Sequence, residues 1–206
     1  SLIKEEIKIP RQTLDQDEIQ RAMELIQKSE RPLIIAGAGI LWSKATDKLY
    51  KFANQYNIPV STTYHARGVF PDDNDLYLGM IGTRGTERAK YAGKNADVII
   101  ALGTRLSERT ISGIADCSMI HVNIDERTFK GDINIKQDVG GFLDSMNNLK
   151  TADFGDWILK LQEYSTHHEI NMDLMSVPVK PQKAIKEILD AAEDSIVVND
   201  AGSHTT

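Results

Sequence analysis

The chain has 206 residues, 41% of them hydrophobic, which is enough to bury the core of one medium-sized domain or of one domain and part of another. Its 30 acidic residues exceed its 24 basic ones, and the formal charge of −6 argues against a nucleic-acid binder, which needs a basic face. The single cysteine, Cys117, excludes an internal disulfide and a zinc site of several thiolates, and no apolar run approaches the roughly 20 residues of a membrane span. We expect a reducing, cytoplasmic location.

The chain opens on an extended arm and a helix. Residues 1–13 alternate apolar and charged side chains with no earlier element to pair with, so we expect a linker arm from a missing upstream domain. Residues 19–26 carry an apolar stripe at helical spacing. Asp15 or Asp17 can cap this predicted helix, and Pro32 follows its end.

A nucleotide-binding type of strand and turn comes next. Residues 33–36 are continuously apolar and predict a short buried strand, which breaks at the glycines of 37–39. Ser43 can cap a second helix, Asn57 ends it, and residues 58–63 predict the second strand.

The segment 64–85 is irregular and rich in glycine, and so long a loop in a compact domain is usually functional. The further predicted elements are a helix over 86–94, strands over 97–102, 119–124 and 133–138, and a helix over 139–150. Apolar strands therefore alternate with helices. This pattern predicts an α/β fold, a Rossmann-like open parallel sheet of about five to six strands with helices on both faces.

The composition divides the chain into four parts. We expect a central nucleotide-binding-type α/β domain over 14–150 and a linker over 151–180, which packs on a domain surface. Residues 181–206 predict a new helix over 181–192 and a new strand over 195–198. Such a start cannot bury its own faces, so we expect the chain to stop inside a further, diphosphate-binding domain.

Polar residues and glycines follow four of the predicted strands. They are 37–39, 62–65, 103–109 and 123–125. In an open parallel sheet these strand ends lie at one edge, where ligands bind. Glycines allow a close backbone approach, and Arg105 and Arg109 can offer forked donors to phosphate oxygens. In an acidic chain, this arrangement favours a nucleotide-like anion.

Plainer interpretations stand beside this one. Trp42 occupies the position of the third glycine of G-x-G-x-x-G, so 37–39 is equally consistent with a tight structural turn. Arg105 and Arg109 could form weak surface ion pairs with Glu108 or Asp116.

No catalytic constellation and no metal site is expected in this chain. His167 and His168 are more consistent with a solvated pair than with a metal site, because no carboxylate or thiol is spaced to complete one. His121 lies in the middle of a predicted strand and is expected in the core or on the sheet surface, and Cys117 has no evident base partner.

Five motifs in order carry a family resemblance. They are RPLIIAGAG over 31–39, PVSTT over 59–63, GMIGTRGT over 79–86, ADVIIALGTR over 96–105 and MIHVNID over 119–125. Together they resemble the central domain of thiamine diphosphate-dependent enzymes, most closely that of acetolactate synthase (acetohydroxyacid synthase) large subunits.

The resemblance implies a transferase of branched-chain amino acid biosynthesis that condenses two 2-oxo acids with decarboxylation, as a cytoplasmic dimer or tetramer. The intact enzyme would use thiamine diphosphate and Mg, whose ligands and catalytic glutamate belong to the outer domains. The fragment alone would therefore be inactive. Nucleic acid and membrane are not expected partners.

The same resemblance implies that the central domain holds FAD in a non-redox role. Carried over by position, the phosphate or ribose would be approached by Gly37, Ala38 and Gly39. The isoalloxazine would be lined by Thr62, Thr63 and Tyr64, with Gly82 and Thr83 nearby, and the ribityl and phosphate groups would be held by Gly103, Thr104, Arg105 and Arg109. The adenosine would lie by Asn123 and Ile124, with Asp138 and Val139 near the adenine. Gly202, Ser203 and His204 would contact the tail of thiamine diphosphate.

The sequence departs from the family at several positions. Thr83-Arg84 stands where Met-His is usual, Ser107 where aspartate is usual, and Asn123 where an acidic residue is common. ADP or an empty site therefore stays open beside FAD. A related decarboxylase or oxidase with ADP or redox FAD also stays open, as does a non-catalytic flavin or nucleotide-binding module.

Overall fold

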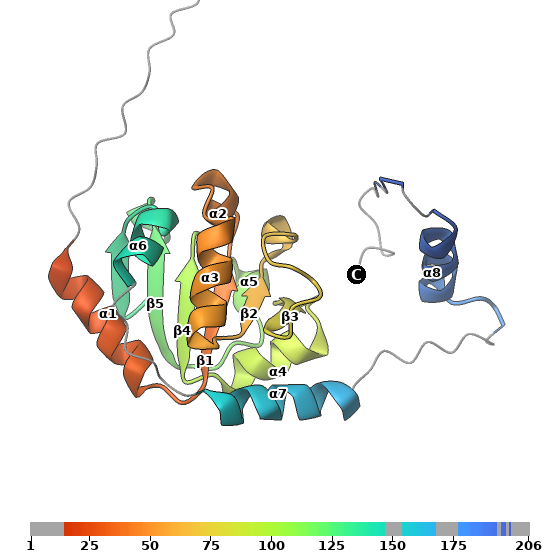
Figure 1. The fold of residues 1–206 in the computed structure, drawn as a ribbon, viewed down its shortest axis with the longest axis horizontal. Coiled ribbons are helices and arrows are strands. Elements are labelled where there is room, and N and C mark those ends of the chain that lie inside the picture. Colours follow the sequence, from red (N-terminus) through yellow and green to blue (C-terminus); the bar gives the residue numbers. More distant parts are fainter. Residues whose placement is uncertain (1–14, 147–153, 168–176, 193–194, 197, 199–206) are drawn as a thin grey trace, which may run out of the picture. The chain divides into compact units, whose positions relative to one another are not determined.

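Residues 32–136 contain a six-stranded, fully parallel sheet (Figure 1). The computed structural model describes residues 15–146, 154–167, 177–192, 195, 196 and 198. The strands are β1 (Pro32–Ala36), β2 (Val60–Thr62), β3 (Tyr77–Met80), β4 (Val98–Leu102), β5 (Ser118–Asn123) and β6 (Ile133–Lys136). Their order is β3-β2-β1-β4-β5-β6, which confirms the predicted Rossmann-like α/β class.

Between the strands lie the helices α2 (Gly39–Trp42), α3 (Thr46–Tyr56), α4 (Glu87–Asn95) and α5 (Glu108–Ile111), with the 3-10 turns η1 (Tyr64–Ala66) and η2 (Glu126–Thr128). Helix α1 (Gln16–Lys28) precedes β1, and α6 (Val139–Ser145), α7 (Gly155–His167) and α8 (Pro181–Ala191) follow β6. The chain divides into two compact units, Ser1–Gln162 and Glu163–Thr206, and the sheet lies in the first. Crossovers between parallel strands are right-handed as a rule, and with that hand the reversal of order between β1 and β4 places the connections on opposite faces of the sheet.

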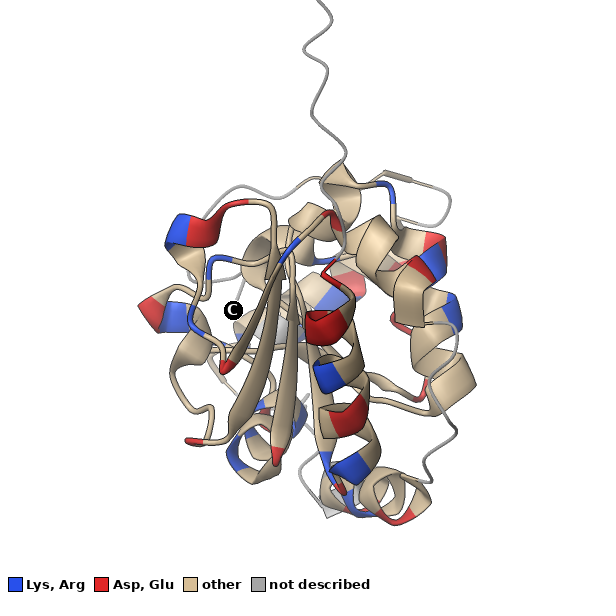
Figure 2. Cartoon of the chain, turned by 90° about the vertical axis from the view of Figure 1, so that its left-hand side faces the viewer, with Lys and Arg blue, Asp and Glu red and all other residues tan. Residues whose placement is uncertain are grey.

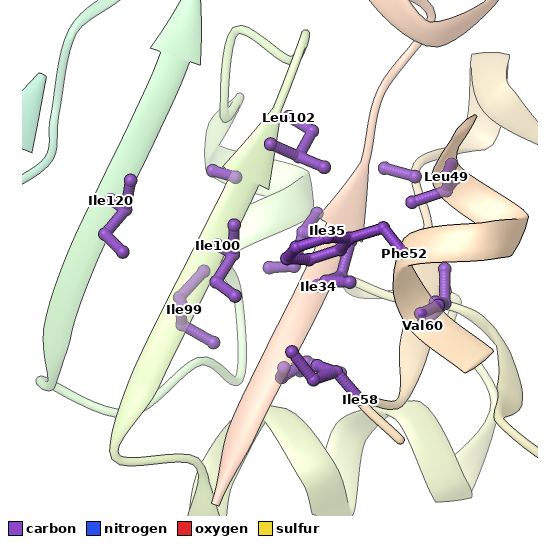
Figure 3. Close-up of a cluster of buried hydrophobic side chains, with 14 of the residues drawn as sticks. Ile34, Ile35, Leu49, Phe52, Ile58, Val60, Ile99, Ile100, Leu102 and Ile120 are labelled. Carbon is purple, nitrogen blue, oxygen red and sulfur yellow. The ribbon is translucent and has the colours of Figure 1, made fainter. Parts of the chain in front are cut away.

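The central strands β1 and β4 are apolar along their whole length because both of their faces are covered. Every residue of PLIIA and of VIIAL is buried. Figure 3 shows Ile34 of β1 and Ile100 of β4 close to Phe52 of α3. Burying one such side chain contributes about 1.5–3 kcal/mol, so this apolar layer stabilises the sheet. Charged residues lie on the helices and at the ends of the strands (Figure 2).

Helix ends follow the predicted signals with one exception. The Asp15 carboxylate accepts hydrogen bonds from the amides of Asp17 and Glu18, and Asn57 ends α3 with a φ of 54°. Ser43 does not begin α3. It ends the extra short helix α2, where its hydroxyl donates to the Gly39 carbonyl at 2.7 Å. The expected single helix is therefore two helices.

Strand β3 lies within the segment that the sequence predicts as an irregular loop. It is an edge strand that pairs with β2 alone, and the register shifts between its pairs. Gly79 inside it has a φ of 88°, a conformation that other residues rarely adopt. This interruption removes the apolar alternation by which a strand of only four residues could be recognised.

Helix α7 lies within the range that the sequence predicts as a linker. Trp157 is buried, its indole Nε1 donates to the Pro32 carbonyl at 3.1 Å, and its ring stacks on that of Tyr91 with a centroid distance of 6.4 Å. Phe154 and Leu161 are buried as well. The first turns of α7 therefore belong to the core of the first unit.

The second unit contains α8, which begins at Pro181 as predicted. Ser195, Ile196 and Val198, the described residues of the strand expected over 195–198, form no strand. The arm over 1–13 lies outside the described residues. Among the helices that the structure describes, none has the length and apolar character to cross a membrane.

Candidate functional site

The carboxyl ends of β1, β4 and β5 lie side by side at one edge of the sheet. The strand order reverses between β1 and β4, and in open α/β sheets such a switch point is where ligands bind. Gly37, Gly103 and Asn123 stand at or directly after these three strand ends. The loops after β1, β4 and β5, which the sequence predicts at one edge of the sheet, therefore lie together.

The glycines at the switch point pack against one another. A Cβ at Gly37 would lie 2.3 Å from the Gly103 carbonyl oxygen, and one at Gly39 would lie 2.6 Å from Gly103 Cα. The Gly37 amide donates to the Leu102 carbonyl at 2.8 Å, and the Gly39 amide to the Gly103 carbonyl at 2.9 Å. These two amides are therefore engaged within the protein, and the glycines serve a backbone contact between the two loops.

The loop after β4 alternates buried and exposed residues. Gly103 and Leu106 both have positive φ, 60° and 47°. Thr104 and Leu106 are buried, and the Leu106 amide donates to Thr104 Oγ1 at 3.1 Å. Arg105, between them, is exposed. Because its neighbours are held in the core, the loop presents the Arg105 side chain to solvent.

Side chains of β5 hold this loop in place. Asn123 Nδ2 donates to the Thr104 carbonyl at 2.9 Å and to Thr128 Oγ1 at 3.0 Å. His121 Nε2 donates to the same carbonyl at 2.8 Å, and its Nδ1 accepts from the Lys130 amide at 3.1 Å. The family resemblance places the carboxamide of Asn123 beside the adenosine. In the structure its NH₂ group donates hydrogen bonds to other parts of the protein.

His121 is fully buried, and burial lowers its pKa below the ordinary 6.5. The hydrogen bond to the Thr104 carbonyl raises the pKa, and the Lys130 cation lowers it. In the unfolded chain the His121 ring takes up a proton near pH 6.5, whereas in the folded chain it does so only at a lower pH. Stability contributed by the neutral ring is therefore full above pH 6.5 and is lost as the pH falls from there toward the lowered folded pKa.

We expect the free energy of unfolding to fall from pH 7.5 to pH 5.5 more steeply in the parent chain than in His121→Gln. One proton contributes at most about 1.4 kcal/mol per pH unit. Urea unfolding at five pH values measures the difference, and the variant corrects for every other titrating group. Parallel pH curves for the two proteins would show that His121 takes up its proton equally well in both states.

Arg105 and Arg109 are exposed at the switch-point end of β4. Among the residues that the structure describes, neither guanidinium forms an ion pair, so the pairing with Glu108 or Asp116 that the sequence allowed is absent. Two unpaired guanidinium groups on one short segment can bind phosphate oxygens with forked hydrogen bonds.

The loop after β3 is docked on α5. Thr83 donates from its amide at 2.9 Å and from its hydroxyl at 3.3 Å to the Arg109 carbonyl. Gly82 has a φ of 112°, and a Cβ there would lie 2.3 Å from the same oxygen. These residues, expected near a flavin ring, therefore also fix the backbone of Arg109.

The remaining predicted residues lie at the same edge of the sheet. Thr62 and Thr63 are buried, and the Thr62 hydroxyl lies 3.0 Å from that of Tyr77. Tyr64 is 52% exposed and could offer its ring to a ligand. At the end of β6, Asp138 accepts from the amides of Gly140 and Gly141 and caps α6. Ala38 caps α2, and Gly39 is its first residue. Ile124, after β5, is exposed, whereas Val139, the first residue of α6, is buried.

Gly202, Ser203 and His204 lie outside the described residues, as does His168. Within the described part of the chain, no group of three or more His, Cys, Asp and Glu side chains could hold a metal ion. The support that His121 gives to the loop after β4 is the feature that sequence reasoning missed. Its signal is the spacing of His121 and Asn123, which places both side chains on one face of β5.

Residues 19–146 match the family model described as "Thiamine pyrophosphate enzyme, central domain". The chain belongs to the thiamine pyrophosphate enzyme family, as its central domain. The match begins within α1, contains all six strands and α6, and confirms the resemblance found in the sequence.

The chain is also similar to proteins named as acetolactate synthase large subunits. It is 32% identical to the "Probable acetolactate synthase large subunit" of Methanocaldococcus jannaschii, over 91% of this chain and 35% of that protein. The "Acetolactate synthase large subunit" of Lactococcus lactis is likewise 32% identical over 91% and 35%. That of Buchnera aphidicola subsp. Schlechtendalia chinensis is 30% identical over 91% and 36%. The chain thus spans about a third of the length of these relatives.

The fit of this central domain to a nucleotide rests on its side chains. Arg105 and Arg109 supply cations, and Tyr64 supplies an exposed ring. The amides of Gly37 and Gly39 are already engaged. The residues present therefore fit a phosphorylated ligand held chiefly by guanidinium groups rather than by a glycine-rich turn.

Proposed function

We propose that this central domain holds FAD in a structural, non-redox role at the carboxyl edge of its sheet, with ADP as the alternative ligand. One observation carries the proposal: Arg105 and Arg109 lie exposed at the switch point of an acidic chain, and neither forms an ion pair with another described residue. Unpaired cations at the edge of the sheet where this fold usually binds ligands favour an anionic ligand.

The residues divide the work between side chains and backbone. Arg105 and Arg109 bind the diphosphate, and Tyr64 packs against an aromatic part of the ligand. The backbones of Gly39 and Gly103 touch, so a side chain at either position would push apart the two loops at the proposed site. Bound in this way, FAD would tie loops of the domain together without taking part in electron transfer.

We infer further that the intact protein is an acetolactate synthase-like transferase that decarboxylates one 2-oxo acid and joins the two-carbon unit to another. The names of the similar large subunits support this inference. Thiamine diphosphate and Mg²⁺ would be bound mainly outside this chain, with Gly202–His204 at the tail of the cofactor. The intact protein would be a cytoplasmic dimer or tetramer, and this chain alone would be inactive.

Ligand binding tests the proposal directly. We expect FAD to raise the thermal midpoint of the purified chain, by the equivalent of about 2.7 kcal/mol at a ligand concentration 100 times Kd. Isothermal titration with FAD, ADP and NAD then ranks the ligands. Tighter binding of ADP than of FAD would select ADP as the ligand, and no binding of any of the three would refute an occupied site. With pyruvate, thiamine diphosphate and Mg²⁺ added, we expect no acetolactate.

A further inference from the structure

The Thr104 carbonyl, in the loop after β4, is held by two donors from the neighbouring strand. His121 Nε2 lies 2.8 Å and Asn123 Nδ2 lies 2.9 Å from this oxygen. The two donors are two residues apart on β5, so both reach the loop from one face of the strand. The loop is thus fixed from β5 and not only by its own turn.

The anchored residues flank Arg105 on both sides. Leu106 takes a left-handed conformation that is unfavourable for leucine, and its carbonyl accepts from Lys130 Nζ at 2.6 Å. Its amide donates to Thr104 Oγ1. Because both neighbours of Arg105 are buried and bonded, the direction in which its guanidinium emerges depends on these anchors.

His121 joins three segments through one buried ring. Nε2 binds the loop after β4, Nδ1 accepts from the Lys130 amide, and the ring lies edge-on to that of Phe129 at 5.6 Å. The ring is therefore the neutral tautomer with its proton on Nε2. Among the described residues, the charged residue that contacts the ring is Lys130, through its backbone amide. Nearby, the carboxylate of Asp125 pairs with Arg127, and that of Asp132 accepts from the Met119 amide.

We propose that His121 is a positioning residue of the nucleotide site, which acts through the loop after β4 to set the guanidinium of Arg105. The inference rests on the proposed function and deepens it. Loss of the ring leaves the Thr104 carbonyl with one donor and the Lys130 amide without its acceptor. A buried group that loses its partner drives the backbone to rearrange, and here the rearranged backbone carries Arg105.

The test compares the leucine and glutamine variants of His121 in the full chain, by isothermal titration with FAD. We expect His121→Leu to raise Kd about tenfold, the scale of one lost buried hydrogen bond, and His121→Gln to stay within about threefold because its amide can still donate. In an Arg105→Gln background, His121→Leu is expected to add almost nothing, since both changes remove the same contact. Ile120→Val, a core change on the same strand, should lower the thermal midpoint and leave Kd unchanged.

Equal weakening by His121→Leu in both backgrounds, or an unchanged Kd, would overturn the positioning role. If the leucine variant does not fold, His121→Asn takes its place, because its shorter side chain places the amide donor farther from Thr104.

Failure of the parent chain to bind FAD or ADP would refute the proposed function, and the part of this inference left to test would be that His121 fixes the loop after β4. Hydrogen exchange of the Leu106 amide then decides, since that amide is bonded within the loop. We expect exchange at Leu106, relative to Ile100 of β4, to be about tenfold faster in His121→Leu and restored in His121→Gln. An exchange ratio equal to that of the parent chain would overturn the proposal.

Discussion

The double variant Arg105→Gln/Arg109→Gln is expected to bind FAD and ADP about a hundredfold more weakly than the parent chain. Each charge-assisted hydrogen bond to a phosphate contributes about 1.5–3 kcal/mol, so each arginine accounts for roughly a tenfold change in Kd. Both side chains are exposed and without an ion pair in the described structure, so their loss leaves no partner uncompensated. Isothermal titration at two salt concentrations measures the effect.

A matched control removes the same charge elsewhere. Lys28 and Lys94 are exposed near the ends of α1 and α4, just before β1 and β4 begin, and so lie by the opposite edge of the sheet. The variant Lys28→Gln/Lys94→Gln lowers the net charge equally and should leave Kd within about twofold, because exposed charges beyond a Debye length of about 8–10 Å are screened. If both double variants weaken binding alike, the arginines act only through the general field of the protein, and the site must lie elsewhere.

The substitution Gly103→Ala is expected to lower the free energy of unfolding by about 3 kcal/mol or more. A Cβ at this position would lie 2.6 Å from Gly39 Cα, and the obstacle is backbone that no rotamer change can move. The φ of 60° adds the cost of a left-handed alanine. Urea unfolding of the purified variant gives the value.

Gly113→Ala separates the two contributions. Gly113 has a φ of 92°, and a Cβ there would meet nothing within 4 Å, so this variant carries only backbone strain of roughly 1–2 kcal/mol. The difference between the variants is the cost of separating the two loops. Equal destabilisation at both positions would mean that the close contact at the switch point relaxes easily.

The elements that were predictable from the sequence are those whose signal is local. The buried strands β1 and β4 are continuous apolar runs, and the caps are adjacent to their helices, Asp15 before α1 and Asn57 after α3. Strand β3 carries no such signal, since Gly79 interrupts four residues of an edge strand. The turn of α7 that holds Trp157 is stabilised by Pro32 and Tyr91, which are remote in sequence.

The features of the candidate site also separate into those with a local sequence signal and those that depend on tertiary packing. Strand ends with glycine and arginine were readable, because parallel strands bring their carboxyl ends to one edge. That the glycine amides bind within the protein was not readable, because it depends on how closely two loops approach. The contact of His121 with Thr104 depends on the register that pairs His121 with Ala101 across β4 and β5.

The backbone contact between Gly39 and Gly103 has a consequence for how any guest would associate. Two loops that are already pressed together and bonded across the sheet have little disorder left to lose when a ligand arrives. Ligand association would then carry a small entropic penalty. Differences in affinity among ligands should appear in their dissociation rates rather than in their association rates.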